Sequence, residues 1–424
     1  MSPNRAMMRF MAFASVALVQ QVQGVALLPV QNVMKTDRTR YEACPESVPK
    51  GTCCVPDAHK QVLDTAFEPD EEQLSKIADE CLFLGRNGAD ASEGARFSYP
   101  ADAEAHFKEI HDALADCCGM TEKGGCGLFS CGHYSAGYRG PWIENHWIEH
   151  FRAQYQALPE HDRKFSRVFG PYIPLLLTWV DNWVSGPWKY PEKLKETLQR
   201  VLRKDVLYIT VSQNDEGVAG KHELNMTHDF SNILVMSAGG YGNVAVPLLK
   251  QQMTPPNKIP MSQRTNDISF VGSKGSAPNG MRVKMVESME NSGLRSEYYQ
   301  GTEWEPVMGR SKASLCPRGF GRTAYHVVEI IQSGLVPVYV YDDVPWVPYP
   351  ALFRKLGYVV QSSDVDAFLK RFQSVSNEEL EEKERVAKRL IDSHFSFCGA
   401  MDQISRFMLG RQTDLECQAL PPPI

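Results

Sequence analysis

One stretch of the chain, residues 312–346, reads KASLCPRGFGRTAYHVVEIIQSGLVPVYVYDDVPW and constrains the fold more than any other. Its pattern predicts a strand at 312–316, a glycine-rich loop, a helix with Thr323 as N-cap, and a second strand at LVPVYVY after Gly334. LVPVYVY carries no charge and has high β propensity, so we expect both of its faces to be covered. A strand–helix–strand unit of this length predicts a right-handed parallel crossover and therefore an α/β fold.

The loop PRGFGRT has the composition of an anion-binding site. Gly319 and Gly321 would let the backbone approach a ligand closely, and Arg318 and Arg322 supply positive charge. The free N–H groups at the start of the following helix also favour an anion. The loop therefore predicts a diphosphate ligand, and a tight turn with solvated arginines is the alternative. Because the loop matches neither GxGxxG nor GxxxxGK[ST], those two nucleotide-binding classes lose support.

The helix that follows the loop is expected to present a polar face. Arg322, Tyr325, His326 and Glu329 recur at helical spacing, whereas the valines and isoleucines between them fill the other face. A carboxylate one turn beyond a phosphate loop can accept hydrogen bonds from a sugar hydroxyl. We therefore expect Glu329 to hold the ribose of a nucleotide.

The same stretch resembles the signature of the exostosin-type glycosyltransferases, which combines a cysteine–proline–arginine–glycine loop, an acidic helix residue, a glycine and an IPV-like strand. Weaker similarity in YIPLLLTWVDNW, DVLYITVSQNDEG, NILVMSAGGYGNVAVPL and DISFVGS extends the resemblance over roughly residues 165–410. It implies two Rossmann-like domains in the GT-B architecture, a nucleotide-sugar donor (a UDP-sugar), and inversion at the anomeric carbon. It implies neither a cofactor nor a metal.

One position departs from that signature. The family usually has an arginine three residues before the acidic helix residue, and this chain has His326. Histidine carries charge only when it is protonated, with an ordinary pKa of about 6.5. If a bound diphosphate and Glu329 favour the protonated ring, donor binding should tighten as pH falls from about 8 to about 6.

The length of the chain predicts two domains, because 424 residues exceed what one hydrophobic core usually serves. KQQMTPPNKIPMSQR at 250–264 contains three prolines and no periodicity, so it is interpreted as the interdomain linker. The predicted parts are a cysteine-rich, disulfide-stapled region at 27–95, an acceptor-side Rossmann-like domain at 96–258, a donor-binding domain at 259–412, and a tail at 413–424.

The start of the chain predicts entry into the secretory pathway. Residues 1–26 combine a basic end, an apolar run and a small-residue cleavage site, so they indicate a signal peptide or an uncleaved membrane anchor. Eight of the 11 cysteines lie between Cys44 and Cys131, which favours disulfides. A zinc site that includes His133 is the alternative. A glycosylation sequon at Asn225 agrees with an ER, Golgi or extracellular location.

Three further groups are candidate site residues. Asp215 and Asp229 are candidates for the general base that an inverting transferase needs to deprotonate its acceptor. Ser273 and Lys274 form a phosphate-type turn after the strand DISFV, where a ligand is expected in an open α/β sheet. Asp342 and Asp343 follow the last strand of the central unit. A metal site there is the alternative to the metal-free donor site that the resemblance implies.

Composition separates the possible functions. The net charge is −6 and there is no long basic run, so nucleic acid is not an expected partner. The expected function is sugar transfer to a glycan or glycoprotein acceptor. A degenerate, non-catalytic member that binds glycan or a partner protein is the alternative, and the histidine at position 326 motivates it. A cysteine-rich extracellular binding protein would account only for the first 150 residues or so. No oligomeric state is predicted.

Overall fold

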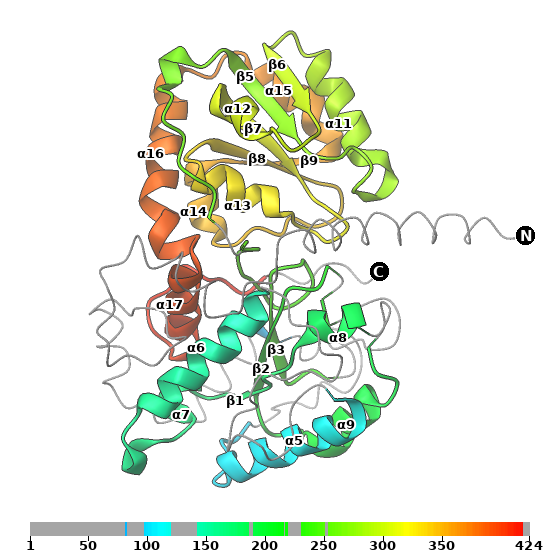
Figure 1. Cartoon of the computed structure of the whole chain (residues 1–424), viewed down its shortest axis with the longest axis vertical. Helices are drawn as coiled ribbons and strands as arrows, with labels where there is room; N and C mark the ends of the chain where they lie inside the picture. The colour runs from blue at the N-terminus through cyan, green and yellow to red at the C-terminus, as the bar shows by residue number, and fades with distance from the viewer. Residues whose placement is uncertain are drawn as a thin grey trace, which may run out of the picture. The chain divides into compact units, whose positions relative to one another are not determined.

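The computed structural model describes residues 81–82, 97–119, 142–185, 190–215, 217–218, 230–250 and 253–418 (Figure 1). The expected signal segment and nearly all of the cysteine-rich region lie outside the described residues. So do Asp229, the Asn225 sequon and His133. Among the described residues, no helix combines the length and the apolar character that crossing a bilayer requires.

The first sheet lies within residues 96–258. Within the described part of the chain its strand order is β1–β2–β3–β4, and every neighbouring pair is parallel. Helices α5 and α9 contact each other, and α6 and α7 form a second group. The bounds are α5 Ala103–Cys118, α6 Ile143–Ala157, α7 Ser166–Phe169, β1 Ile173–Pro174, α8 Trp179–Ser185, α9 Leu194–Val201, β2 Tyr208–Ser212, β3 Ile233–Ser237 and β4 Val244–Ala245.

The second sheet lies within residues 259–412. Its strand order is β6–β5–β7–β8–β9, and again every neighbouring pair is parallel. The bounds are β5 Asn266–Val271, α11 Met281–Glu290, β6 Ser296–Tyr299, α12 Glu305–Gly309, β7 Ser311–Pro317, α13 Tyr325–Gln332, β8 Val336–Tyr341, α14 Pro350–Leu356, β9 Tyr358–Gln361, α15 Val365–Phe372, α16 Asn377–His394 and α17 Phe397–Met408. The short 3₁₀ helices of both halves are η1 Glu160–Asp162, η2 Met261–Gln263, η3 Pro278–Gly280 and η4 Ser362–Asp364.

Strand β8 shows why the sequence forms this layered arrangement. Side chains alternate between the two faces of a strand. Val336, Val338 and Val340 join the apolar core under α11 and α15, whereas Tyr339 packs into the core under α13 and α14. Both faces are therefore covered, as the uncharged sequence of this strand predicts. The mixed α/β class with parallel sheets is confirmed.

The end of the chain returns to the first half. Helix α17 contacts α6 and α7, although it follows the second sheet in sequence (Figure 1). Beyond it, Val244 and Cys417 form an isolated antiparallel bridge, and Cys417 is disulfide-bonded to Cys81 with a Cα–Cα distance of 5.1 Å. A second disulfide joins the neighbours Cys117 and Cys118. The stapling predicted for the region before residue 96 lies otherwise outside the described residues.

Candidate functional site

The loops after the strands of one sheet meet the loops after the strands of the other. All described residues belong to one compact unit. The backbone N–H of Arg322, which follows β7, donates to the carbonyl of Gly239, which follows β3, at 3.0 Å. The amide of Gln213, after β2, donates to the hydroxyl of Tyr325 at 2.6 Å. The carboxyl ends of parallel strands are where open α/β sheets bind ligands, so this junction is the candidate site.

Glycines allow the two loops to approach at backbone distance. A Cβ on Gly321 would lie 2.2 Å from the carbonyl oxygen of Gly239 and 3.0 Å from that of Asp215. Gly240 has φ of +130°, and a Cβ there would lie 2.5 Å from the backbone nitrogen of Arg322. The side chain of Arg322 also stacks over the Tyr241 ring at 4.0 Å. In the structure, the backbone that lies directly against Gly321 is that of Gly239 and Asp215, in the first half of the chain.

Two aspartates neutralise the loop arginines. Arg318 Nη1 lies 2.7 Å from Asp342 Oδ1 and 2.8 Å from Asp343 Oδ1, and Arg322 Nε lies 2.8 Å from Asp343 Oδ2. The arginine side chains are only 4% and 3% exposed. Burial alone would raise the pKa of Asp343, but the hydrogen bond from Arg322 and the charges of both arginines outweigh it and hold that pKa below its ordinary value. Contact of Arg318 or Arg322 with a donor diphosphate stays a prediction.

The start of α13 differs from its predicted form. The N-cap is Ala324, with φ −150° and ψ 151°, and no side chain caps the helix, so the prediction that Thr323 is the cap was wrong. Thr323 is instead buried, and its carbonyl accepts the N–H of Gly319 at 2.9 Å. The glycine loop is therefore closed by its own backbone hydrogen bond. At the other end, Gly334 follows the helix with φ of +71°, as a C-terminal glycine is expected to do.

Glu329, the candidate ribose ligand, already contacts two nitrogen atoms. One carboxylate oxygen pairs with the amino group of Lys250, and the other lies 3.0 Å from Nδ1 of His326. The Lys250 amino group also lies 5.9 Å from the ring centroid of Tyr325 and 6.0 Å from that of Trp304. Burial lowers the pKa of Lys250. The linker thus supplies a cation that the sequence pattern of the central unit does not contain.

His326 lies in an environment that disfavours its charged form. Its Nε2 is 3.4 Å from the hydroxyl oxygen of Ser314, and its ring meets Phe270 edge-on at 6.3 Å. Burial, followed by the charges of Arg282 and Lys250, lowers the pKa of His326 to about 3. The ring of His326 is therefore neutral near pH 7 in the protein on its own, and tighter donor binding between pH 8 and pH 6, which requires a bound diphosphate, stays a prediction.

The turn after β5 brings Ser273 and Lys274 close to the glycine loop. Arg282, near the start of α11, donates to the carbonyl of Ser273 at 3.0 Å and to those of Pro317 and Arg318 at 3.2 and 2.9 Å. The Lys274 amino group lies over the Tyr298 ring at 4.1 Å. The fold thus gathers the predicted phosphate turn, the glycine loop and α13 at one end of the second sheet.

Asp215 lies at the same junction, on the side of the first sheet. It is exposed, follows β2 by three residues, and packs its backbone against Gly321. Its carboxylate lies just beyond the carboxyl end of a strand, the edge at which open α/β sheets bind ligands. Asp229, the second candidate base, lies outside the described residues.

The sequence reasoning missed one buried acid at this edge, Glu144. Glu144 is fully buried, and its two carboxylate oxygens accept the backbone N–H of Val180 at 2.5 Å and of Gln213 at 2.9 Å. Burial, with a further contribution from Asp181, raises the pKa of Glu144 well above its ordinary value. Glu144 thereby fixes the loop that carries Gln213 toward Tyr325. The available signal was a carboxylate in the first turn of a helix whose apolar positions include Trp147, Phe151 and Tyr155.

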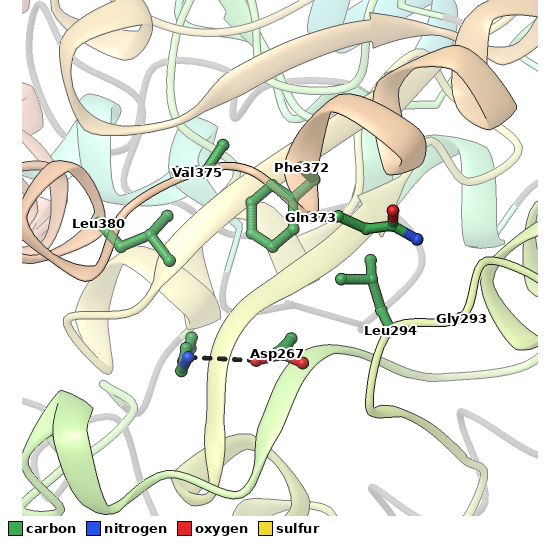
Figure 2. A pocket seen from close by; sticks show the side chains of 8 residues that line it. Asp267, Gly293, Leu294, Phe372, Gln373, Val375 and Leu380 are labelled. Carbon is green, nitrogen blue, oxygen red and sulfur yellow. Dashed lines mark ion pairs between the residues drawn. The ribbon is translucent and has the colours of Figure 1, made fainter.

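A cavity of about 400 Å³ lies elsewhere on the second sheet. Figure 2 shows it beside Asp267, whose carboxylate is 3.1 Å from the amino group of Lys312, with Phe372 and Leu380 also in its lining. Asp267 and Lys312 are the second residues of β5 and β7, so this cavity lies at the amino ends of the strands. That is the edge opposite to the glycine loop, and ligands of open α/β sheets bind at the carboxyl ends.

Comparison with known proteins gives no family. No family model matches the chain, and no curated protein matches it. Similar solved structures include a glycosyltransferase from Rickettsia africae ESF-5, with 9% identity, a TM-score of 0.33, and coverage of 74% of this chain and 97% of that one. TarM has 8% identity and a TM-score of 0.31. The match covers 50% of this chain and 52% of TarM, so the chain spans about half of TarM's length. Sucrose-phosphate synthase from Thermosynechococcus elongatus has 11% identity, a TM-score of 0.27, and coverage of 72% and 88%. Likenesses this distant carry no argument about chemistry, which has to come from the residues of this chain.

Proposed function

We propose that this chain is an inverting glycosyltransferase that moves a sugar from a nucleotide diphosphate sugar, in particular a UDP-sugar, to a glycan or glycoprotein acceptor. The observation that carries the proposal is the junction of the two parallel sheets. Their carboxyl ends meet through the hydrogen bond from Arg322 to Gly239, and the stretch that resembles the exostosin signature lies at that junction. A donor on one sheet and an acceptor on the other would there lie within reach of each other.

The residues of the second sheet are assigned to the donor. The turn at Ser273 and Lys274, the loop with Gly319 and Gly321, and the helix face of Tyr325 and Glu329 surround the carboxyl ends of β5 and β7. Glu329 accepts the ribose hydroxyls in place of, or together with, Lys250. Positive charge and backbone N–H groups at this edge favour the diphosphate as it leaves.

Asp215 is assigned to the acceptor. Inversion needs a general base that takes the proton of the attacking hydroxyl while the carbon–oxygen bond to the leaving diphosphate breaks. Asp215→Asn should keep the fold and nucleotide affinity and lower the turnover rate by about 10²- to 10⁴-fold. Release of nucleoside diphosphate over a panel of donors and acceptors measures this. Glu216→Gln, next in the chain, is the matched control. Equal turnover by Asp215→Asn and the wild type would remove Asp215 from this role.

A non-catalytic, glycan-binding or partner-binding role is the second candidate, and one observation favours it. The groups that the signature offers to a donor are already engaged, because Asp342 and Asp343 contact Arg318 and Arg322 while Lys250 and His326 contact Glu329. Calorimetry with UDP and UDP-sugars separates the two candidates at the binding step. Glycan binding with neither nucleotide binding nor turnover would support the second candidate.

We propose a secretory location with the same function. The support is the signal-like start, the clustered cysteines and the Asn225 sequon. Expressed with its own N-terminus in a eukaryotic host, the protein should carry disulfides and an N-glycan that Asn225→Gln removes. A reduced, unglycosylated protein in the cytosol would contradict this location. Size analysis of the purified product also shows whether residues 1–26 are cleaved.

A further inference from the structure

The buried positive charges of the second sheet are unequally neutralised. Arg318 and Arg322 share the carboxylates of Asp342 and Asp343, which balances two cations with two anions. Arg282 is 7% exposed, and within the part of the chain that the structure describes its hydrogen bonds go only to backbone carbonyls. Among the described residues, no aspartate or glutamate forms an ion pair with it. A buried charge without a counter-charge is costly.

The contacts of Arg282 leave part of its hydrogen-bonding capacity unused. A guanidinium has five N–H groups, and three of them are accounted for by the carbonyls of Ser273, Pro317 and Arg318. Nη1 and Nη2 each retain one further N–H that donates to none of the described residues. Those carbonyls belong to the two loops that surround the predicted phosphate position. Arg282 therefore fixes both loops and carries an uncompensated charge between them.

The surroundings of Arg282 fit a small anion. A Cβ added to Gly319 would lie 3.8 Å from Arg282 Nη2 and 3.9 Å from the carbonyl of Ser276, so this glycine borders the guanidinium. At Gly275 a Cβ would meet only the hydroxyl of Ser273, at 3.8 Å, and the space there is otherwise open. Lys274 adds a second cation beside Tyr298. Two glycines, which leave the backbone uncovered, and two cations on adjoining loops are the elements of a phosphate site.

The neighbouring ionisable groups support the same assignment. His326 is in the field of Arg282, and that field contributes to keeping its ring neutral. Ionised Tyr298 would favour the charged form of Arg282, but burial raises the pKa of the Tyr298 phenol, so this side chain is neutral near pH 7. Neither side chain supplies a negative charge to this corner.

We propose that Arg282, between the Ser273–Ser276 turn and the Gly319 loop, binds a phosphate group of the nucleoside diphosphate, and that Arg318 and Arg322 hold the loop through Asp342 and Asp343. This assignment rests on the proposed function for the identity of the ligand. It changes which guanidinium meets the phosphate. The same chemistry is present in inorganic pyrophosphate, so the anion site can be tested apart from the nucleotide.

The test compares three probes by calorimetry on the secreted protein: UDP, uridine and inorganic pyrophosphate. Arg282→Lys keeps the positive charge but loses the planar set of N–H donors of the guanidinium. We therefore expect UDP and pyrophosphate to bind about 10- to 150-fold more weakly and uridine to bind unchanged. Arg310→Lys, at a surface arginine paired with Glu297, is the matched control and should bind all three as the wild type does.

The outcomes separate the anion site from the proposed function. Pyrophosphate binding that depends on Arg282, without any nucleotide binding, would keep the anion site and remove the nucleotide-sugar donor. UDP binding that is equal in wild type and Arg282→Lys would overturn the role of Arg282 and leave the proposed function in place. A wild type that binds neither UDP nor pyrophosphate overturns the inference as well.

Arg282 fixes two loops, so its variant can fail to fold, and a second measurement on the wild type covers that case. Crystals soaked in selenate should show an anomalous peak within about 4 Å of the Arg282 guanidinium, the range of a charge-assisted contact. A peak beside Arg318 or Arg322 instead, or no peak in either place, would contradict the assignment.

Discussion

Arg322 and Gly239 are joined backbone to backbone, with the N–H of Arg322 3.0 Å from the carbonyl oxygen of Gly239. The bond runs from the glycine loop after β7 to the loop after β3, and the indole of Trp346 adds a second bond to the carbonyl of Ser237 at 3.0 Å. A backbone bond of this kind tolerates little change in spacing. The geometry of the candidate site therefore depends on how closely the two loops approach.

Gly321→Ala should disrupt that approach. Its Cβ would lie 2.2 Å from the carbonyl of Gly239, and neither backbone can give way cheaply. We expect a loss of about 1–3 kcal/mol in the free energy of unfolding, measured by urea denaturation. Gly275→Ala is the matched control, since its Cβ meets only a hydroxyl at 3.8 Å, and it should change stability little. Equal stability of the two variants would contradict this packing.

Glu329→Gln should weaken nucleotide binding. The substitution keeps the shape of the side chain and removes the charge that faces Lys250 and His326. Loss of a hydrogen bond that involves a charged group gives roughly a 10- to 150-fold weaker affinity for UDP by calorimetry. Lys250→Met removes the ion pair and keeps the carboxylate. If that variant binds UDP as weakly as Glu329→Gln does, the ion pair and not the ribose contact is responsible.

Asp343→Asn should act on stability and on binding in opposite directions. The substitution breaks the carboxylate's contacts with Arg318 and Arg322. Because Asp343 is partly exposed, we expect the free energy of unfolding to fall by about 1–3 kcal/mol, which is less than for a fully buried pair. It also raises the net charge of this edge by one, so UDP should bind more tightly at low salt. Denaturation and calorimetry at two ionic strengths measure both effects. Weaker binding would mean that the carboxylate itself contributes to the site.

His326→Gln should make the protein less sensitive to acid. The folded-state pKa of about 3 lies below the ordinary value of 6.5, so between these limits the unfolded chain binds more protons. The contribution of His326 to the free energy of unfolding is therefore fully present above about pH 6.5. It decreases as the pH falls toward 3, by up to about 1.4 kcal/mol per pH unit. Urea denaturation from pH 7 to pH 4 should show a flatter curve for the variant.

The control for this measurement is His161→Gln, at an exposed position. Burial lowers the pKa of His111 to about 4, so that residue adds to acid sensitivity in every variant and cancels in the comparison. Parallel curves for wild type and His326→Gln would show that the ring of His326 is not kept neutral in the folded protein.

The elements that local pattern determines were the ones that could be predicted. The uncharged run before Asp342 formed a strand covered on both faces, and Gly334 ended its helix, because each depends on a few neighbouring residues. Thr323 failed as a cap because of the conformation of the loop itself. The loop before α13 closes on itself through Gly319 and continues to Tyr325 in an extended conformation, which puts Ala324 at the cap position.

The electrostatics of the site could not be predicted in the same way. The sequence places Arg318 and Asp343 after neighbouring strands, but it does not show that their side chains meet at 2.8 Å. Lys250 reaches Glu329 from a linker that has no periodicity. Burial, followed by the charge of Arg282 on another helix, lowers the pKa of His326. Each of these is a property of distances between segments remote in sequence.

The return of α17 to the first half has a consequence for biosynthesis. Gly170 is covered by the carbonyl of Met408, and the N–H of Gln418 donates to the carbonyl of Asn243 at 2.7 Å, so the layer around β1–β4 is completed by residues that are synthesised after the whole second sheet. We expect a nascent chain that ends near residue 395 to hold its second sheet folded while its first half remains open to protease. Limited proteolysis of ribosome-bound chains of increasing length would then show protection spreading from the later half of the sequence to the earlier one, against the direction of translation.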